Sequence, residues 1–306
     1  MAEPVMVSTR PKRKVETMEP SVVVGYDQSP SSELALDVAA AEAAWRGAEL
    51  IVVHAFHRMT DVGGSPHELP SGDPRQAAAL RIAEHGAERI GSRHLDLTVH
   101  PRAVVGFAPA VLAQASVDAE LLVVGHRGHG GFAGLNLGSV ALRSVTHAVC
   151  PVVVVRGSDH PPRGLVVAAV DIDDGADEVL DFAFAEADRR KVRLKVVSTL
   201  EILWPFAYAG DSGQLHHAED EALERADMVL GELLHSRQVK YPDVAVEHDL
   251  VQGSPTAVLD AATKDADLIV AGARRRAHGH QGLLVGPTVT PLLQHADCMV
   301  AVVPHD

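Results

Sequence analysis

Short apolar runs alternate along the chain with longer segments in which apolar residues recur at helical spacing. In the first half, runs rich in Val, Ile and Leu predict strands near 21–26, 49–55, 97–104, 121–125 and 151–156. Helices are predicted near 31–47, 74–93, 108–118 and 138–148, and Ser29 followed by Pro30 supplies the start of the first. Continuous apolar strands are typical of sheets that helices cover on both faces. The alternation therefore predicts an α/β fold with a parallel, doubly wound sheet, and a ligand site at the carboxyl ends of its strands.

The same pattern occurs a second time. Residues 121–125 (LLVVG) are matched 147 residues later by 268–272 (LIVAG), and Gly106 is matched by Gly253 at the same distance. Residues 22–27 match 166–171 after 144 residues, and 150–155 match 298–303 after 148. The second half predicts strands near 165–170, 192–198, 244–250, 267–272 and 299–303. We therefore expect two tandem five-stranded domains, divided into a disordered tail at 1–20, a first domain at 21–156, a linker at 157–164 and a second domain at 165–304.

Composition and charge limit the classes of partner and compartment. The 306 residues suffice for two domains with their own cores, and the net charge of −14 disfavours nucleic acid as a partner. No apolar run approaches the roughly 18 residues that a membrane span needs, and residues 1–20 lack the apolar core of a secretion signal. Two cysteines provide no disulfide framework, which favours a reducing cytoplasm.

The segment VVGHRGHGGFAGLNLGSV, residues 123–140, carries the clearest chemistry. A strand ends in Gly125, Gly128 follows after two intervening residues, and Gly138 and Ser139 open the next helix. Glycines allow backbone N–H groups to approach an anion closely, and the N-terminus of the following helix favours negative charge. An ordinary glycine-rich surface loop is the alternative, but the strand before it and the helix after it favour a phosphate site.

This spacing resembles the ATP-binding signature of the universal stress protein family. The opening VVVGYDQSPSSELALDVA and the segment HAVCPVVVV match as well, and the resemblance covers residues 20–156 and 163–304. It implies a tandem member of that family, with ATP, and in some cases Mg²⁺, as cofactor. It also implies that Asp27 contacts the adenosine moiety, that the Ala55 backbone contacts adenine, and that the glycine loop holds the phosphates. The implied loop residues are Gly125, Gly128, Gly138 and Ser139, with Val140 close by.

The second half departs from this signature. The resemblance carries a second, weaker set of site residues: Asp171, Thr199, Gly272, Gly286 and Thr288. Arg274, Arg275 and Arg276 stand where the loop glycine is expected, and Pro287, which has no N–H to offer, replaces the serine. Arginines bind phosphate by charge-assisted hydrogen bonds, so either retention or loss of phosphate binding in the second half stays open. We expect a weakened or silent second site.

Other chemistries find less support. The acidic run at Asp171, Asp173 and Asp174 lacks calcium-loop spacing and is interpreted as a helix N-cap, and the histidines show no metal-ligand spacing, so no metal site is predicted. No Walker motif and no nucleophile elbow occur, and no catalytic residue is assigned.

Three classes of function follow from these observations. The first is an ATP-binding regulatory protein, for which the resemblance implies a role in the stress response. The second is a slow ATP hydrolase or nucleotidyl-transferring enzyme of the same fold, and the third is a scaffold without nucleotide. The apolar terminal strands of the two halves predict an intramolecular pseudo-dimer, with a further homodimer open.

Overall fold

The computed structural model describes residues 19–57, 74–129, 136–156, 161–200, 212–276 and 282–306. The predicted tail at 1–20 and the first part of the predicted linker lie almost wholly outside these residues. In the described part of the chain, no helix is both long enough and apolar enough to cross a membrane.

The first half alternates strand and helix, as its pattern predicts. Its elements are β1 (Ser21–Gly25), α1 (Pro30–Arg46), β2 (Glu49–Phe56), α2 (Pro74–Gly91), β3 (Val99–Val105), α3 (Ala108–Ala115), β4 (Leu121–Gly125), α4 (Ser139–His147) and β5 (Val152–Val155). The Ser29 side chain accepts a hydrogen bond from the Ser32 N–H, which confirms Ser29 as the N-cap of α1. This cap fixes the turn between β1 and α1, where the predicted Asp27 lies.

The second half repeats the arrangement with two differences. Its elements are β6 (Leu165–Val170), α5 (Ala176–Arg190), β7 (Arg193–Leu200), α6 (Ser212–Lys240), β8 (Val246–Gln252), α7 (Pro255–Thr263), β9 (Leu268–Arg275), β10 (Leu283–Leu284), α8 (Val289–His295) and β11 (Met299–His305). Strand β9 runs past its predicted end at residue 272, and β10 pairs with it in an antiparallel hairpin.

The predicted N-cap at Asp173 or Asp174 is wrong, because Gly175 precedes α5 in a left-handed conformation and Asp174 pairs with Arg274 instead.

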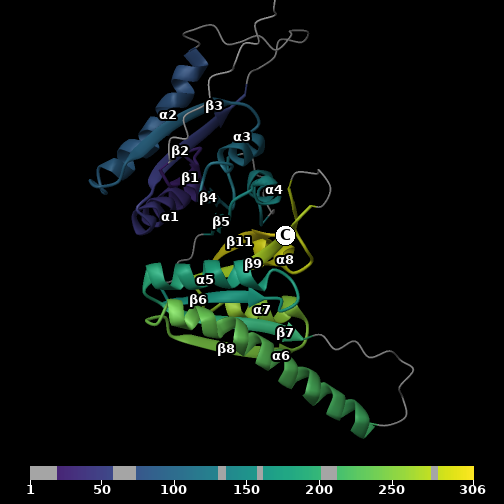
Figure 1. Ribbon diagram of the computed structural model, residues 1–306. Helices are drawn as coiled ribbons and strands as arrows, with labels where there is room; N and C mark the ends of the chain where they lie inside the picture. Colours follow the sequence, from purple (N-terminus) through teal and green to yellow (C-terminus); the bar gives the residue numbers. More distant parts are fainter. Residues whose placement is uncertain (1–18, 58–73, 130–135, 157–160, 201–211, 277–281) are drawn as a thin grey trace, which may run out of the picture.

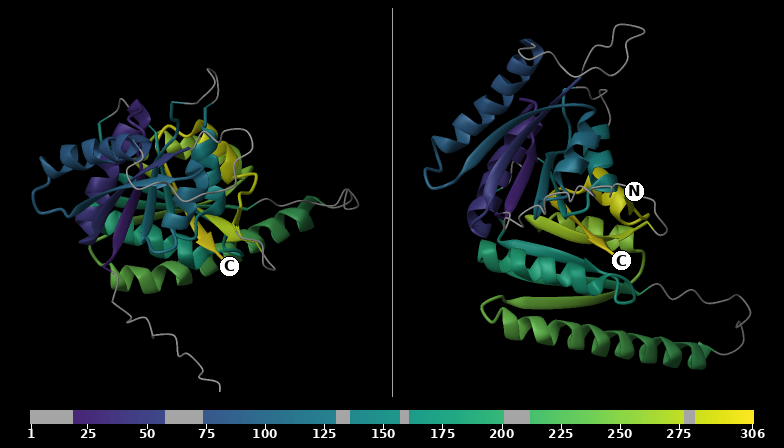
Figure 2. Two further views of the ribbon diagram at one scale, coloured as in Figure 1. Left: turned by 90° about the horizontal axis from the view of Figure 1, so that it is seen from above. Right: turned by 45° about the horizontal axis from the view of Figure 1, so that its top comes forward.

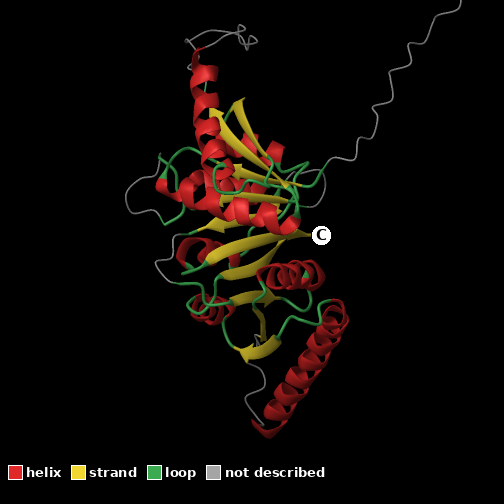
Figure 3. Cartoon of the chain, turned by 90° about the vertical axis from the view of Figure 1, so that its left-hand side faces the viewer, coloured by secondary structure: helices red, strands yellow, loops and turns green. Residues whose placement is uncertain are grey.

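The two predicted five-stranded sheets are joined edge to edge. Among the described residues, each half has five parallel strands, and their order is β3-β2-β1-β4-β5-β11-β9-β6-β7-β8, with β10 beside β9 off this path. Strands β5 and β11 pair antiparallel, with Val154 opposite Val300, and this confirms that the terminal strands of the two halves pair within one chain. The strands of both halves follow one another in a single twisted stack with helices on both faces (Figures 1 and 3). Val154 and Val300 are fully buried, so this junction belongs to the core.

A buried group of charges joins helices α1 and α5 at the same junction. Glu42 and Glu186 are both 0% exposed, and each forms ion pairs with Arg46 and with Arg190. The residues correspond between the halves, since Glu186 and Arg190 each lie 144 positions after their counterparts. The two helices lie next to each other where the halves meet (Figures 1 and 2). We call these four residues the charge quartet. Its mutual pairing offsets the cost of burying each charge.

The end of the predicted linker is fixed to the second half. The Asp267 carboxylate accepts hydrogen bonds from the backbone N–H groups of Arg163 and Gly164, both at 2.7 Å. It also accepts one from Leu165, at the start of β6, at 3.2 Å. Residues 163 and 164 therefore pack as part of the second half.

Candidate functional site

A cavity of about 420 Å³ lies at the carboxyl ends of β1, β2 and β4. Helices α1, α3 and α4 and the loops after β1 and β4 contribute the rest of its described lining. All the site residues predicted in the first half line it: Asp27, Ala55, Gly125, Gly128, Gly138, Ser139 and Val140. Residues separated by more than a hundred positions thus come together where a doubly wound sheet places its ligand.

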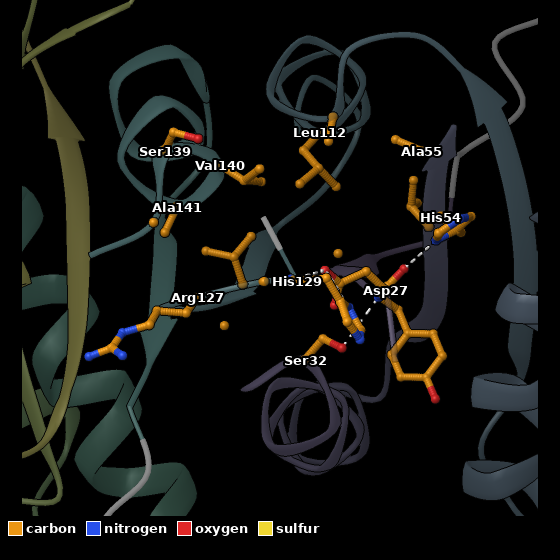
Figure 4. A pocket seen from close by; sticks show the side chains of 18 of the residues that line it. Asp27, Ser32, His54, Ala55, Leu112, Arg127, His129, Ser139, Val140 and Ala141 are labelled. Carbon is orange, nitrogen blue, oxygen red and sulfur yellow. Dashed lines mark hydrogen bonds and ion pairs between the residues drawn. The ribbon is translucent and has the colours of Figure 1, made fainter. Parts of the chain in front are cut away.

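Asp27 supplies the negative charge of the cavity (Figure 4). Its carboxylate accepts hydrogen bonds from the backbone N–H groups of Ser29, at 3.0 Å, and His129, at 3.3 Å, while its own N–H donates to Ser32 Oγ at 3.3 Å. Burial raises the pKa of Asp27, but hydrogen bonds from Ser29, Ser32 and the His129 backbone outweigh it and hold the pKa below its usual value. An ionised, oriented carboxylate is thus available to accept hydrogen bonds from hydroxyl or amine groups.

The first two loop glycines are required by close approach within the protein. A Cβ on Gly125 would lie 2.6 Å from the carbonyl oxygen of Ser31, and one on Gly128 would lie 2.6 Å from Oδ2 of Asp27. Because real Cβ atoms do not approach so closely, a side chain at either position would displace α1 or the Asp27 carboxylate. The glycines therefore hold the loop against Asp27 and bring its backbone to the cavity.

The amino end of α4 forms another wall. Gly138 is its N-cap, has an extended backbone conformation and makes no side-chain capping hydrogen bond. Ser139, Val140 and Ala141 follow as the first helical residues, and all three line the cavity. Their N–H groups have no acceptor within the helix, so the helix geometry leaves them available to an anion. Ser139 adds a hydroxyl donor.

The remaining wall is apolar, and sequence reasoning missed most of it. Val53 and Ala55 from β2, Ala108 and Leu112 from α3, and Leu137 line this side. Ala55 lies within β2, paired in register with Val104 of β3, so its peptide groups are held at the cavity mouth. The apolar periodicity of α3 is a generic core signal, and it does not distinguish a ligand wall from ordinary packing. Such a wall suits a flat, weakly polar group.

The loop basic residues do not all face the cavity. Arg127 is turned away from Asp27, whereas His129 lies beside it, with Nδ1 3.5 Å from Oδ2 (Figure 4). His126 points into the protein, where Nδ1 lies 2.9 Å from Ser31 Oγ. Burial, and then the nearby Arg156, lower the pKa of His126, so its ring is neutral at pH 7. His126 thus supports the loop from behind.

In the second half, the residues that would form the matching loop are engaged elsewhere. Arg274 and Arg275 lie within β9, with Arg274 paired to Asp174 at 2.8 Å and Arg275 donating to the Val149 carbonyl at 3.2 Å. Gly272 is packed against the buried His305, since a Cβ there would lie 3.0 Å from the imidazole ring. A β-hairpin therefore stands where the first half has its glycine loop.

The other predicted residues of the second site lie in separate settings. Thr199 is in β7, opposite Val251 of β8, and the Asp171 carboxylate accepts a hydrogen bond from the Asp173 N–H at 3.1 Å. Thr288 caps α8 without a side-chain hydrogen bond, and the Gly286 carbonyl accepts from Thr290 within that turn. Their local geometry is that of turns and strand pairs rather than of one loop around a cavity.

Comparison with known proteins agrees with this architecture. The profile of the Universal stress protein family matches residues 18–156 and again 164–304. The chain belongs to the universal stress protein family. A universal stress protein of Mycobacterium tuberculosis is 31% identical over 294 residues, covering 92% of this chain and 95% of that relative. Another from the same organism is 30% identical over 299 residues, covering 92% of this chain and 96% of the relative.

A solved structure supports the tandem fold of this family member. A universal stress protein from Archaeoglobus fulgidus superimposes with a TM-score of 0.64, covering 94% of this chain and 100% of that chain, at 17% sequence identity. At this identity the likeness concerns the fold alone. Within the described residues, no group of three or more His, Cys, Asp or Glu side chains is arranged to hold a metal ion.

Proposed function

We propose that this universal stress protein binds ATP in the first-half cavity and acts as a nucleotide-dependent regulator in the stress response. The observation that carries the proposal is the convergence of Asp27, the loop glycines and the amino end of α4 on one cavity. The apolar wall that includes Ala55 and Leu112 suits an adenine ring. Asp27 then accepts hydrogen bonds from the ribose hydroxyls, and the N–H groups at the start of α4 receive the phosphates.

The charges in the cavity fit this orientation. Asp27 is the one carboxylate among the described lining residues, so it repels phosphate and favours the nucleoside end of the ligand. The amino end of α4 favours anions at the opposite wall. Mg²⁺, when present, would be held mainly by the phosphates themselves, because a single carboxylate does not make a magnesium site.

Isothermal titration calorimetry with ATP, and chromatography of nucleotide released by heating purified protein, test the proposal. Binding of ATP that is lost when the cavity is altered at Gly128 supports it, and equal affinity in such a variant contradicts it. Turnover assays with Mg·ATP address the enzyme alternative. Steady release of ADP above about one turnover per minute would identify a hydrolase, because typical enzymes turn over about once per second or faster.

We also propose a reducing, cytoplasmic setting and a single chain as the basic working unit. Cys150 and Cys298 are free and buried, and burial raises the pKa of each thiol to about 12, which keeps both unreactive. The junction of β5 with β11 already pairs the terminal strands of the halves. Light scattering of purified protein measures whether a second copy associates through another surface.

A further inference from the structure

A second cleft, of about 640 Å³, lies where the two halves meet. One wall is formed by the faces of α3 and α4 that point away from the nucleotide cavity, and the other by the β9–β10 hairpin of the second half. The hairpin lies beside α4 at the junction of the halves (Figure 1). We call this space the junction cleft. It is distinct from the nucleotide cavity, and no described residue lines both.

The described lining of the junction cleft is basic in an acidic protein. The chain carries a net charge of −14, yet the described residues that line this cleft include Arg143, Arg275 and Arg276 and no Asp or Glu. A concentration of guanidinium groups inside a concave surface attracts anions and binds them by charge-assisted hydrogen bonds. This local reversal of sign is the first indication of a ligand.

The polar contacts of these arginines leave donors for a ligand. Arg275 donates to the Val149 carbonyl, and its Nε lies 3.3 Å from the carboxylate of the exposed Asp306. Arg276 donates through Nε to the Leu283 carbonyl at 3.4 Å. The Arg143 guanidinium lies over the Phe107 ring, 5.2 Å from its centroid. A guanidinium has five N–H groups, so these contacts occupy only part of the available donors.

Apart from Gln114 and His147, the rest of the described lining is apolar, and several of these apolar side chains are exposed. Phe107 is 45% exposed, Val117 is 54% exposed and Val149 is 42% exposed, and all three line the cleft. Apolar surface gathered in a concave site marks a place where a ligand removes it from water. A bare inorganic anion would leave this surface exposed, so a matching ligand carries an apolar body as well as a negative group.

The cleft depends on both halves being fixed against each other. Gly282, at the foot of the hairpin, has φ +116, and a Cβ there would lie 2.4 Å from the Thr146 carbonyl oxygen. The hairpin is thus seated directly on the end of α4, and only glycine fits. The arginines of the second half are in this way held opposite Phe107 and Arg143 of the first.

We propose that the junction cleft binds a small amphiphilic anion, with a carboxylate or phosphate head placed among Arg143, Arg275 and Arg276 and an aliphatic body on the apolar wall. Carboxylate and phosphate heads share the chemistry that guanidinium groups recognise. Burial of the body against Phe107 and Val117 provides the remaining affinity. The proposal does not rest on nucleotide binding in the other cavity.

Calorimetric titration of the full chain with decanoate and with decyl phosphate, each below its micelle concentration, tests the proposal. We expect one molecule bound per chain, and the tighter of the two probes identifies the head group. The double variant Arg143→Gln, Arg276→Gln removes two exposed guanidiniums and should weaken binding about a hundredfold. Val117→Glu, which places a carboxylate on the wall, should weaken it about tenfold.

Matched controls separate this site from general adsorption. Arg81→Gln removes an exposed positive charge on α2, far from the cleft, and should leave the affinity unchanged. The neutral probe 1-decanol and inorganic phosphate alone should both bind at least tenfold more weakly than the amphiphile. Failure of both amphiphiles to bind, equal binding of 1-decanol, or unchanged affinity in the double variant overturns the proposal. Unfolding midpoints within about 2 °C of the parent protein show that the variants remain folded.

Discussion

The two halves share a strand order but differ at the point where the fourth strand ends. In the first half, β4 stops at Gly125 and the chain enters the loop around the cavity. In the second, β9 continues to Arg275, because β10 pairs with it through Leu283 and Leu284. Three added strand residues and a short partner strand are enough to replace the glycine loop by a hairpin. The difference shows that this site depends on where a strand stops as much as on which residues follow.

Each half has an imidazole ring next to the start of its first helix, but the two rings come from different positions in the chain. In the first half, His126 contacts Ser31. In the second half, Ala273 and Gly175 occupy the corresponding positions, and the ring of His305, from β11, packs against Gly175. The second half thus fills the space with a residue from its longer terminal strand, and it does so without supporting a loop.

The charge quartet is alike in the two halves, so equivalent substitutions in it should lower the free energy of unfolding equally. Glu42→Gln and Glu186→Gln each leave the buried arginines of the charge quartet without a full counter-charge. Each change should lower the free energy of unfolding by about 3–5 kcal/mol, and the two values should agree within about 1 kcal/mol. Chemical denaturation measures both, with Glu88→Gln on the exposed face of α2 as the control. Strongly unequal losses would show that the quartet is not symmetric in energy.

A methyl group in the first-half loop should have the next largest effect. In Gly128→Ala the added Cβ pushes the Asp27 carboxylate from its place, and ATP affinity should fall about a hundredfold. Gly91→Ala, where nothing lies within 4 Å of the new Cβ, is the matched control and should bind normally. Calorimetry gives both affinities, and circular dichroism checks the fold. Normal ATP binding in Gly128→Ala would remove Asp27 and the loop from the site.

The corresponding aspartates sharpen the comparison. Asp27→Ala removes a carboxylate that lines the cavity, and ATP affinity should fall about tenfold, the typical loss for one charged hydrogen bond. Asp171→Ala changes the equivalent residue of the second half and should leave both the affinity and a stoichiometry of about one nucleotide per chain unchanged. A stoichiometry of two in the parent protein would mean that the second half binds nucleotide by other contacts.

The smallest expected effect concerns pH. The pKa of His126 is lowered in the folded protein, so the unfolded chain binds the proton more tightly. Its contribution to stability is therefore complete above the unfolded pKa of about 6.5 and is lost as pH falls through the lower folded value. Between pH 7.5 and 5.5 the parent protein should lose up to about 1 kcal/mol more than His126→Gln. Thermal unfolding at the two pH values measures the difference, and identical losses would contradict it.

The sequence contained enough to predict the sheet class, the pairing of the halves and the glycine loop, because these depend on local signals such as apolar runs, a glycine spacing and a serine cap. Asp27 and Ala55 came from the resemblance to the family, and most of the apolar wall was not predicted. The extension of β9 escaped prediction, because Arg274 and Arg275 look like loop residues and become strand only through pairing with a distant two-residue partner. Asp174 likewise has N-cap character, but a partner 100 positions away, Arg274, takes its carboxylate. Non-local partners decide such positions.

The antiparallel pairing of β5 with β11 also gives the molecule a direction. The carboxyl ends of the first-half strands lie along one side of the common sheet, and the carboxyl ends of the second-half strands lie along the opposite side. A partner that approaches the side with the Asp27 cavity would therefore contact the glycine loop of the first half and the amino ends of the second-half strands. The two ends of the molecule therefore differ, although the two halves are repeats of one fold. A protein that docks at the end with the Asp27 cavity would contact a single such cavity, in one orientation.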